Sequence, residues 1–494
     1  MRQFKFTGNS VFSDAELAKV TAPFEGRVIT AEELEEVRYR LTVYYVNRGY
    51  INSGAVIPDQ EVVDGIITMR IVEGRLTDIE VSGNKSLRTE YLGGRIAPKT
   101  GTVLNLTELQ ERLQLLQQND LIDRINAELA PGIKPGQSVL NVDIEEASPY
   151  DFAFVFANDR PPSVGAERAE FYAAHRNLTG WGDAFGLRYG LTDGADDVAG
   201  FYTRPLNARD TTLSLSAARS SSTVVEQPFS DLDIDSELDT YEISVTHPLY
   251  QTPLQSLTLS VALDRRHSET FLLGRPFSFS PGVQDGESDA TVLRLSQGWI
   301  DRNLNQVLAA RSTFSLGVDA FGATVNGGAL PDGQFLAWLG QFQWARRFSE
   351  SGNQLIVRTD LQLAEDPLLP LEQFAVGGAA TVRGYRENQL VRDNGFVASA
   401  ELRIPVFRLP IPRLSRTAED GSVQLAPFAD FGWAENTDIA TPDPKTISSV
   451  GLGLRWDPSD DLHAELYWGY GLRDIDSLDD DLQDSGIHFR VQAF

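Results

Sequence analysis

The chain has 494 residues, a formal net charge of −27 and no cysteine. This length exceeds one ordinary globular core, so we expect two or more domains. Phosphate binding requires a basic face, and the acidic balance therefore argues against nucleic acid as a partner. No apolar run reaches the roughly 18 residues of a helical membrane span. A transmembrane β-barrel is still allowed, because it hides its apolar surface at alternate positions.

The first residues show no secretory signal. Residues 1–6 lack the apolar stretch that such a signal requires. A cytoplasmic protein is one interpretation and a mature or truncated chain is the other, and the rest of the sequence favours the second. The absence of cysteine is consistent with passage through an oxidising compartment without disulfides.

An internal repeat occupies residues 1 to about 147. Residues 4–9 match residues 79–84, at the offset that carries Gly8 onto Gly83. The same offset carries Val28, Glu33, Leu34 and Leu41 onto Val103, Glu108, Leu109 and Leu116. We therefore predict two tandem copies of one small domain, at residues 1–75 and 76–147.

Each copy begins with a short alternating strand and continues with two helices. In the first copy Ser13 and Thr30 stand where N-caps belong, and Glu33 follows Thr30 at the capping-box spacing. Two strands, at residues 51–57 and 66–72, complete a β-α-α-β-β order. This order predicts a three-stranded sheet with helices on one side, whose uncovered edge can accept a strand from an extended peptide.

From about residue 148 the helical patterns vanish, and alternating segments of roughly ten residues recur. One face of these segments is mostly apolar, and the other is rich in Ser, Thr, Gly, Arg and Asp. The clearest segments are residues 184–191, 255–263, 312–320, 354–363, 396–404, 448–456, 462–470 and 487–494. We predict an all-β transmembrane barrel over residues 148–494, with about 16 antiparallel strands, lipid outside and a polar lumen inside. A soluble all-β domain is the alternative, but few continuous apolar runs are present to build its core.

The acidic stretches and the tryptophans of this region can be assigned to loops and to the membrane interface of such a barrel. The Asp-rich stretches at residues 231–239 and 474–484 are interpreted as extracellular loops kept soluble by charge. Divalent cations could bind there, but the stretches lack the ligand spacing of a calcium loop, and no metal site is predicted. An interfacial aromatic girdle is expected from residues near strand ends, namely Trp181, Trp299, Trp338, Trp456 and Trp468.

The most distinctive stretch is residues 381–388, which follows a glycine-rich approach at residues 376–380. Glycines permit backbone angles that other residues avoid, so the stretch predicts a tight loop tip carrying an arginine and an aromatic side chain. The residues that we single out are Val382, Arg383, Gly384 and Tyr385. Taken alone, the motif is also compatible with a hairpin loop whose arginine is solvated.

Taken together, these features resemble the outer-membrane transporters of two-partner secretion, the haemolysin secretion/activation (TpsB) family. Residues 48–50, 57–60 and 72–74 resemble its first POTRA domain, residues 126–132 with 135–136 resemble its second, and residues 177–183 resemble its early-barrel signature. The resemblance implies α+β tandem POTRA domains followed by the barrel. It also implies the bacterial outer membrane as location, with the POTRA domains in the periplasm.

In that family the arginine-bearing loop folds back into the barrel, and the arginine pairs with an aspartate on an inward strand face. By motif, the resemblance places Arg383 against Asp430, within residues 427–432. Phe428, Asp430 and Gly432 share one face of the alternating pattern. An unpaired arginine in a narrow lumen would be costly, so a carboxylate partner is expected.

The resemblance implies a protein-conducting pore without a cofactor. The POTRA domains would capture an unfolded exoprotein of haemolysin or adhesin type, and the barrel would pass it to the cell surface. Two alternatives stay open: an insertase for other barrels, whose members usually carry more POTRA repeats, and a passive porin, which would not need the tandem domains. An enzyme is not expected, because the five histidines are scattered without a zinc-protease spacing and no Gly-x-Ser-x-Gly elbow occurs.

Overall fold

A computed structural model describes residues 1–96, 102–134, 136–328, 330–348, 352–476 and 481–494. The chain divides into two compact units. The first comprises Met1–Ser148 with Thr179–Gly182, and the second comprises Pro149–Leu178 with Asp183–Phe494. Among the described helices, none combines the length and the hydrophobicity that a membrane span requires.

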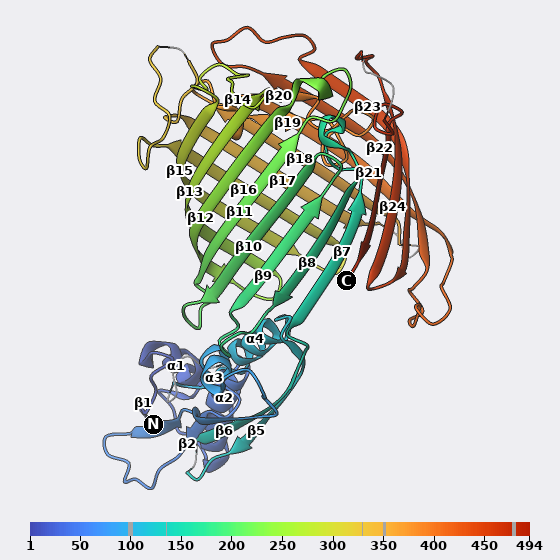
Figure 1. The fold of residues 1–494 in the computed structure, drawn as a ribbon. Coiled ribbons are helices and arrows are strands. Elements are labelled where there is room, and N and C mark those ends of the chain that lie inside the picture. Colours follow the sequence, from blue (N-terminus) through green and yellow to red (C-terminus); the bar gives the residue numbers. More distant parts are fainter. Residues whose placement is uncertain (97–101, 135, 329, 349–351, 477–480) are drawn as a thin grey trace. The chain divides into compact units, whose positions relative to one another are not determined.

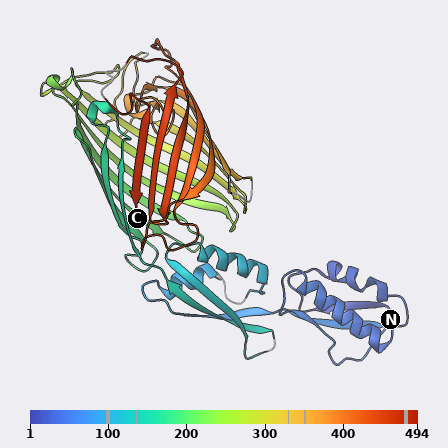
Figure 2. The ribbon, with the colours of Figure 1, turned by 90° about the vertical axis from the view of Figure 1, so that its right-hand side faces the viewer.

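The first small domain has a three-stranded sheet in the order β1-β3-β2. Its elements are β1 (Gln3–Thr7), α1 (Asp14–Thr21), η1 (Ala22–Phe24), α2 (Ala31–Val46), β2 (Gly54–Val56) and β3 (Ile66–Val72). Both helix starts are confirmed, since Ser13 with Glu16 and Thr30 with Glu33 form capping boxes. Leu17 and Leu41 from the helices pack with Met69 of the central strand, so helices and sheet share one apolar core. Figure 2 shows the helices of this domain lying against its sheet.

The second small domain repeats this topology, with sheet order β4-β6-β5. Its elements are β4 (Arg75–Ser82), α3 (Thr89–Ile96), α4 (Leu106–Gln117), β5 (Ile122–Pro131) and β6 (Gln137–Glu146). In both sheets the first strand runs parallel to the central strand and the remaining strand runs antiparallel to it. Pro135, part of the motif attributed to this domain, lies outside the described residues.

The strand predicted at residues 51–57 is shorter in the structure, and its edge is less open than expected. Only Gly54–Val56 pair with β3, because the chain turns just before them, where the Ser53 N–H donates to the Tyr50 carbonyl. The Ala55 N–H donates to Oγ1 of Thr42 on α2, and on the opposite edge strand the Phe4 N–H donates to Glu25. Side chains of this domain therefore occupy part of both sheet edges.

The second unit is a closed antiparallel barrel (Figure 1). Sixteen strands of the described chain build its wall, and the last pairs with the first through Arg490–Ala493 and Phe154–Ala157. The two-residue strand β14 (Arg275–Pro276) adds a short pairing to β13. The wall strands are β7 (Tyr150–Ala157), β8 (Arg168–His175), β9 (Ala184–Leu191), β10 (Ala195–Pro205), β11 (Thr212–Thr223), β12 (Ile234–Gln251), β13 (Gln255–Leu272), β15 (Glu287–Arg302), β16 (Gln306–Gly317), β17 (Leu336–Arg347), β18 (Gln354–Ala364), β21 (Asn394–Arg408), β22 (Ser422–Glu435), β23 (Thr446–Ser459), β24 (Leu462–Gly471) and β25 (Ile487–Ala493).

Side chains alternate across the barrel wall as the sequence predicts. On β13, Val261 points outward and is 46% exposed, whereas Asp264 points inward and is 3% exposed. Ser296 on β15 and Asp430 on β22 are likewise buried. The wall therefore presents apolar side chains to its surroundings and polar side chains to its lumen.

Three predictions about the barrel need correction. Residues 234–239 of the predicted acidic loop belong to β12, because this strand pairs with β13 along nearly its whole length. The strand predicted at residues 312–320 ends at Gly317. Trp181 belongs to the first unit, where it packs against the apolar core of the second small domain instead of joining a girdle. The acidic stretch 474–484 does lie in the connection between β24 and β25, although residues 477–480 are outside the described part of the chain.

Candidate functional site

The connection between β18 and β21, residues 365–393, carries the arginine motif, and we call it the lumen loop. Two short strands, β19 (Phe374–Val376) and β20 (Leu390–Arg392), pair with each other, and the turn η4 (Pro370–Glu372) precedes them. We call η4 and these two strands the stalk, and residues 377–389 the tip. The tip is bonded within itself, since the Gly377 N–H donates to Oγ1 of Thr381 and the Ala379 N–H donates to Glu387.

The structure places Arg383 directly against Asp430. Nε of Arg383 lies 2.9 Å from one carboxylate oxygen of Asp430, and Nη2 lies 2.9 Å from the other. The backbone N–H of Arg383 donates to the same carboxylate. Arg383 is 5% exposed and Asp430 is 3% exposed, so this is a buried bidentate pair that fixes both position and orientation.

A second carboxylate, which the sequence analysis missed, completes the arginine site. Nη1 of Arg383 donates to Glu401 on β21, and Nη2 donates to Ser399 on the same strand. Glu401 also accepts from Tyr467 and Arg403. The alternating pattern of residues 396–404 held the signal, because Ser399 and Glu401 share a face and Glu401 is the only acidic residue in that segment.

Phe428 and Gly432 shape the space around the tip. The guanidinium carbon of Arg383 lies 3.6 Å from the centre of the Phe428 ring, a cation–π contact. A Cβ on Gly432 would lie 2.3 Å from Cγ1 of Val376 and 2.9 Å from Cγ2 of Val382. Gly432 therefore leaves the room in which Val376 and Val382 are fully buried.

Gly384 lets the tip lie flat against the last two strands. It adopts a φ of 90°, and its N–H donates to Nε2 of His488 on β25. A Cβ on Gly384 would lie 2.8 Å from the backbone of Gly469 on β24, and a Cβ on Gly486 would lie 2.0 Å from the Gly469 carbonyl oxygen. Three glycines thus form a crossing of backbone against backbone, in which no methyl group fits. In the sequence, His488 is one of five scattered histidines and belongs to no motif.

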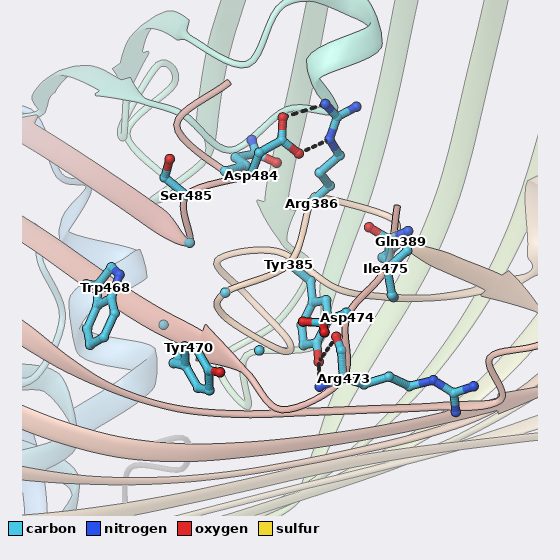
Figure 3. Close-up of a pocket in the computed structure, with 15 residues that line it drawn as sticks. Tyr385, Arg386, Gln389, Trp468, Tyr470, Arg473, Asp474, Ile475, Asp484 and Ser485 are labelled. Carbon is cyan, nitrogen blue, oxygen red and sulfur yellow. Dashed lines mark hydrogen bonds and ion pairs between the residues drawn. The ribbon is translucent and has the colours of Figure 1, made fainter. Parts of the chain in front are cut away.

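Tyr385 and Arg386 hold the other side of the tip (Figure 3). The Tyr385 hydroxyl accepts from the Arg473 N–H and lies 3.0 Å from the Ser448 carbonyl oxygen. Arg386 makes a bidentate pair with Asp484 in the connection between β24 and β25, and it also binds Glu226 between β11 and β12. The motif therefore connects the inner wall to two other loops of the barrel.

The small domains contain a repeated carboxylate of a different kind. Burial alone would raise the pKa of Glu73, but hydrogen bonds from Ser10 and Val11 outweigh it and hold the pKa below its ordinary value. In the second copy Glu146 has a lowered pKa for the same reason, since Ser86, Leu87 and Lys85 donate to it. Glu73 directly follows the central strand β3 and Glu146 is the last residue of the central strand β6, and each binds the loop between the first strand and the first helix of its domain.

The described residues contain no group of three or more His, Asp or Glu side chains arranged to hold a metal ion. Several charged side chains of the lumen are paired with one another, as Arg168 is with Asp159 and Arg455 with Glu465. The contacts of Arg383, Gly384 and Arg386 described above hold the loop in place.

The closed barrel, its apolar exterior, its pinned lumen loop and its two α/β repeats define an outer-membrane β-barrel transporter with periplasmic POTRA domains. The chain belongs to the haemolysin secretion/activation protein ShlB/FhaC/HecB family, whose model matches residues 136–456. Residues 1–74 match the POTRA domain of ShlB type. These are the transporters of two-partner secretion.

Relatives of this chain include the outer membrane transporter CdiB of Dickeya dadantii, which is 22% identical over 83% of this chain and 73% of its own length. The heme/hemopexin transporter protein HuxB of Haemophilus influenzae is 25% identical over 35% of this chain and 31% of its own. The solved structure of CdiB from Escherichia coli covers all of this chain and 90% of that one, with 23% identity and a TM-score of 0.77. The structural likeness supports the fold described above.

Proposed function

We propose that this transporter captures an unfolded exoprotein with its POTRA domains and passes it through the barrel to the cell surface, with no catalytic step and no cofactor. The observation that carries the proposal is the lumen loop. A barrel whose lumen holds a loop pinned by a buried Arg383–Asp430 pair is suited to regulated opening, whereas a passive porin needs no such device.

The second POTRA domain supports the capture step. In the first domain Thr42 and Glu25 take up backbone N–H groups on the two sheet edges. On β5 of the second domain, Gln117 binds the backbone at Asp123 and Ile125, and the strand continues from there to Pro131. An extended segment of exoprotein would add to this far half of β5 by backbone pairing, which reads little sequence.

Translocation into proteoliposomes that contain only the full chain tests the proposal. The probe is the urea-unfolded product of the neighbouring reading frame, scored by protection from added protease. We expect protected exoprotein, and none with the same probe in protein-free liposomes or with the probe refolded beforehand. Lack of protection, together with faster insertion of an unrelated unfolded barrel protein, would replace secretion by the insertase function.

A further inference from the structure

A second buried charge cluster holds the lumen loop at its stalk. Nη2 of Arg294 on β15 lies 2.9 Å from both carboxylate oxygens of Glu372, the last residue of η4. Nε of the same arginine donates to Asp264 on β13. Arg266, also on β13, donates to the Leu371 carbonyl and lies 3.3 Å from Glu372. The side chains of Glu372 and Asp264 are each 5% exposed, so both carboxylates are buried, while Arg294 and Arg266 are 19% and 30% exposed.

Other contacts join the stalk and its two flanking residues, Leu368 and Asp393, to the rest of the barrel. Asp393, 1% exposed, accepts from the Leu368 N–H, the Gln373 amide and the Thr437 N–H. Leu368 packs with Ala290 and Val292 of β15, and Val376 and Leu390 pack with residues of β21, β22 and β23. Charge pairs, hydrogen bonds to the Asp393 carboxylate and apolar packing therefore hold the stalk and its flanking residues.

The tip, unlike the packed contacts of the stalk just described, lies beside two cavities. A cavity of about 430 Å³ is lined by Ala379, Ala380, Arg383 and Glu387 on one side of it. Another of about 390 Å³ is lined by Gly384, Tyr385, Arg386 and Gln389. Stalk and tip meet at Gly377 and Gly378, whose φ values of 115° and 97° favour glycine. The tip thus has space beside it and a glycine pair at its base, while its own hydrogen bonds keep it together.

We propose that Glu372, held by Arg294 and Arg266, is a positioning residue that fixes the stalk in the wall while the tip turns about Gly377–Gly378 and leaves Asp430 to open the lumen. The inference rests on the proposed function, which requires an opening step. In this inference the stalk of the lumen loop stays in place and the tip moves.

The absence of cysteine makes a matched pair of disulfide locks possible. A Cβ on Gly432 would lie 2.9 Å from Cγ2 of Val382, and a Cβ on Gly395 would lie 2.9 Å from Cγ of Phe374. Both pairs bring the β-carbons near the separation of about 3.5–4.5 Å that a disulfide needs. Val382→Cys with Gly432→Cys locks the tip, and Phe374→Cys with Gly395→Cys locks the stalk.

We expect the oxidised tip lock to reduce exoprotein protection at least about tenfold and a reductant to restore it, while the oxidised stalk lock stays within about twofold of the unmodified chain. A stalk lock that blocks transport, or a tip lock that permits it, would overturn the proposal. The single variants Gly432→Cys and Gly395→Cys are the controls for the substitutions themselves.

Spin labels report on the same division without a lock. With the full chain in liposomes, we expect the unfolded exoprotein to raise the mobility of a label at Ala380→Cys on the tip and to leave a label at Ala375→Cys on the stalk unchanged. Glu372→Gln should release the label at Ala375→Cys while the barrel stays folded, and Glu435→Gln, on an exposed ion pair with Lys445, should not. Equal mobility at Ala375→Cys with and without Glu372→Gln would remove Glu372 from the role.

The two proposals fail in distinguishable ways. If the unmodified chain protects no exoprotein, the proposed function fails. The locks can then still be compared by ionic conductance in planar bilayers, where the tip lock must suppress opening events and the stalk lock must not. The reverse result there would overturn the inference regardless of what the pore transports.

Discussion

The POTRA unit and the barrel bury opposite kinds of side chain. In the POTRA unit Leu41 and Leu92 are fully buried, and ion pairs such as Arg38–Glu35 lie on the surface. In the barrel Arg383 and Asp430 are buried, and apolar side chains such as Val261 face outward. The same chain therefore folds under two rules, because water surrounds the first unit and lipid surrounds the second.

The largest effect that would test this comparison comes from Arg383→Ala. It leaves Asp430 and Glu401 buried without their cation, and we expect the barrel to lose about 3–5 kcal/mol of stability. Urea unfolding of the full chain in detergent micelles measures the loss. The control is Arg219→Ala, which removes an exposed pair with Glu237 and should cost no more than about 1 kcal/mol. Equal losses of stability in the two variants would mean that water solvates the charges of the lumen as well as it solvates those of the surface.

A smaller loss of stability is expected when an exposed valine is replaced by arginine, once in the barrel and once in the POTRA unit. Val261→Arg places a charge on the lipid face near the middle of β13, and we expect it to cost about 2–4 kcal/mol. Val28→Arg, at a POTRA residue that is 89% exposed, should change stability by no more than about 0.5 kcal/mol. Folding yield in lipid vesicles and resistance of the POTRA domains to protease report on the two sites. A harmless Val261→Arg would contradict the assignment of that face to lipid.

The smallest effect sharpens the comparison within the POTRA unit. The pKa of Glu73 is lowered from 4.5 in the folded state, so this carboxylate stabilises the first POTRA domain above pH 4.5. The contribution disappears as the pH falls through the lower folded pKa. Glu73→Gln should remove this pH dependence and cost about 1–3 kcal/mol at neutral pH, because Ser10 and Val11 lose their charged acceptor.

Protease resistance of the POTRA domains, followed in the full chain from neutral to acidic pH, measures the change. Glu35→Gln is the control, since Glu35 is an exposed partner of Arg38. A Glu73→Gln profile that still falls below pH 4.5 as the parent does would assign the acid sensitivity to another group.

Local features were predictable from the sequence, and features set by distant partners were not. Helix starts at Ser13 and Thr30 follow from residues three places apart, so the capping boxes could be found. The length of β12 is set by β13, and the acidic composition of residues 234–239 concealed it. The number of barrel strands was predictable from the total length of the barrel region. An error in the bounds of one strand, such as β12, does not change that estimate.

The lumen site divides in the same way. The resemblance placed Arg383 with Asp430, and the structure brings these two side chains together. Glu401 could have been found from its face on the strand, but nothing in the sequence joins Glu372 to Arg294, which is 78 residues away. Such pairs depend on the course of the loop through the lumen, and this course cannot be predicted from the sequence.

The crossing of Gly384, Gly469 and Gly486 has a consequence for how the barrel closes. The tip of the lumen loop and the hairpin β24–β25 meet at these three glycines, with no space there for a methyl group. The hairpin also supplies β25, the strand that meets β7 and ends the circle. The seat of the lumen loop and the strand that closes the barrel therefore share one hairpin, so a substitution that displaces this hairpin disturbs both.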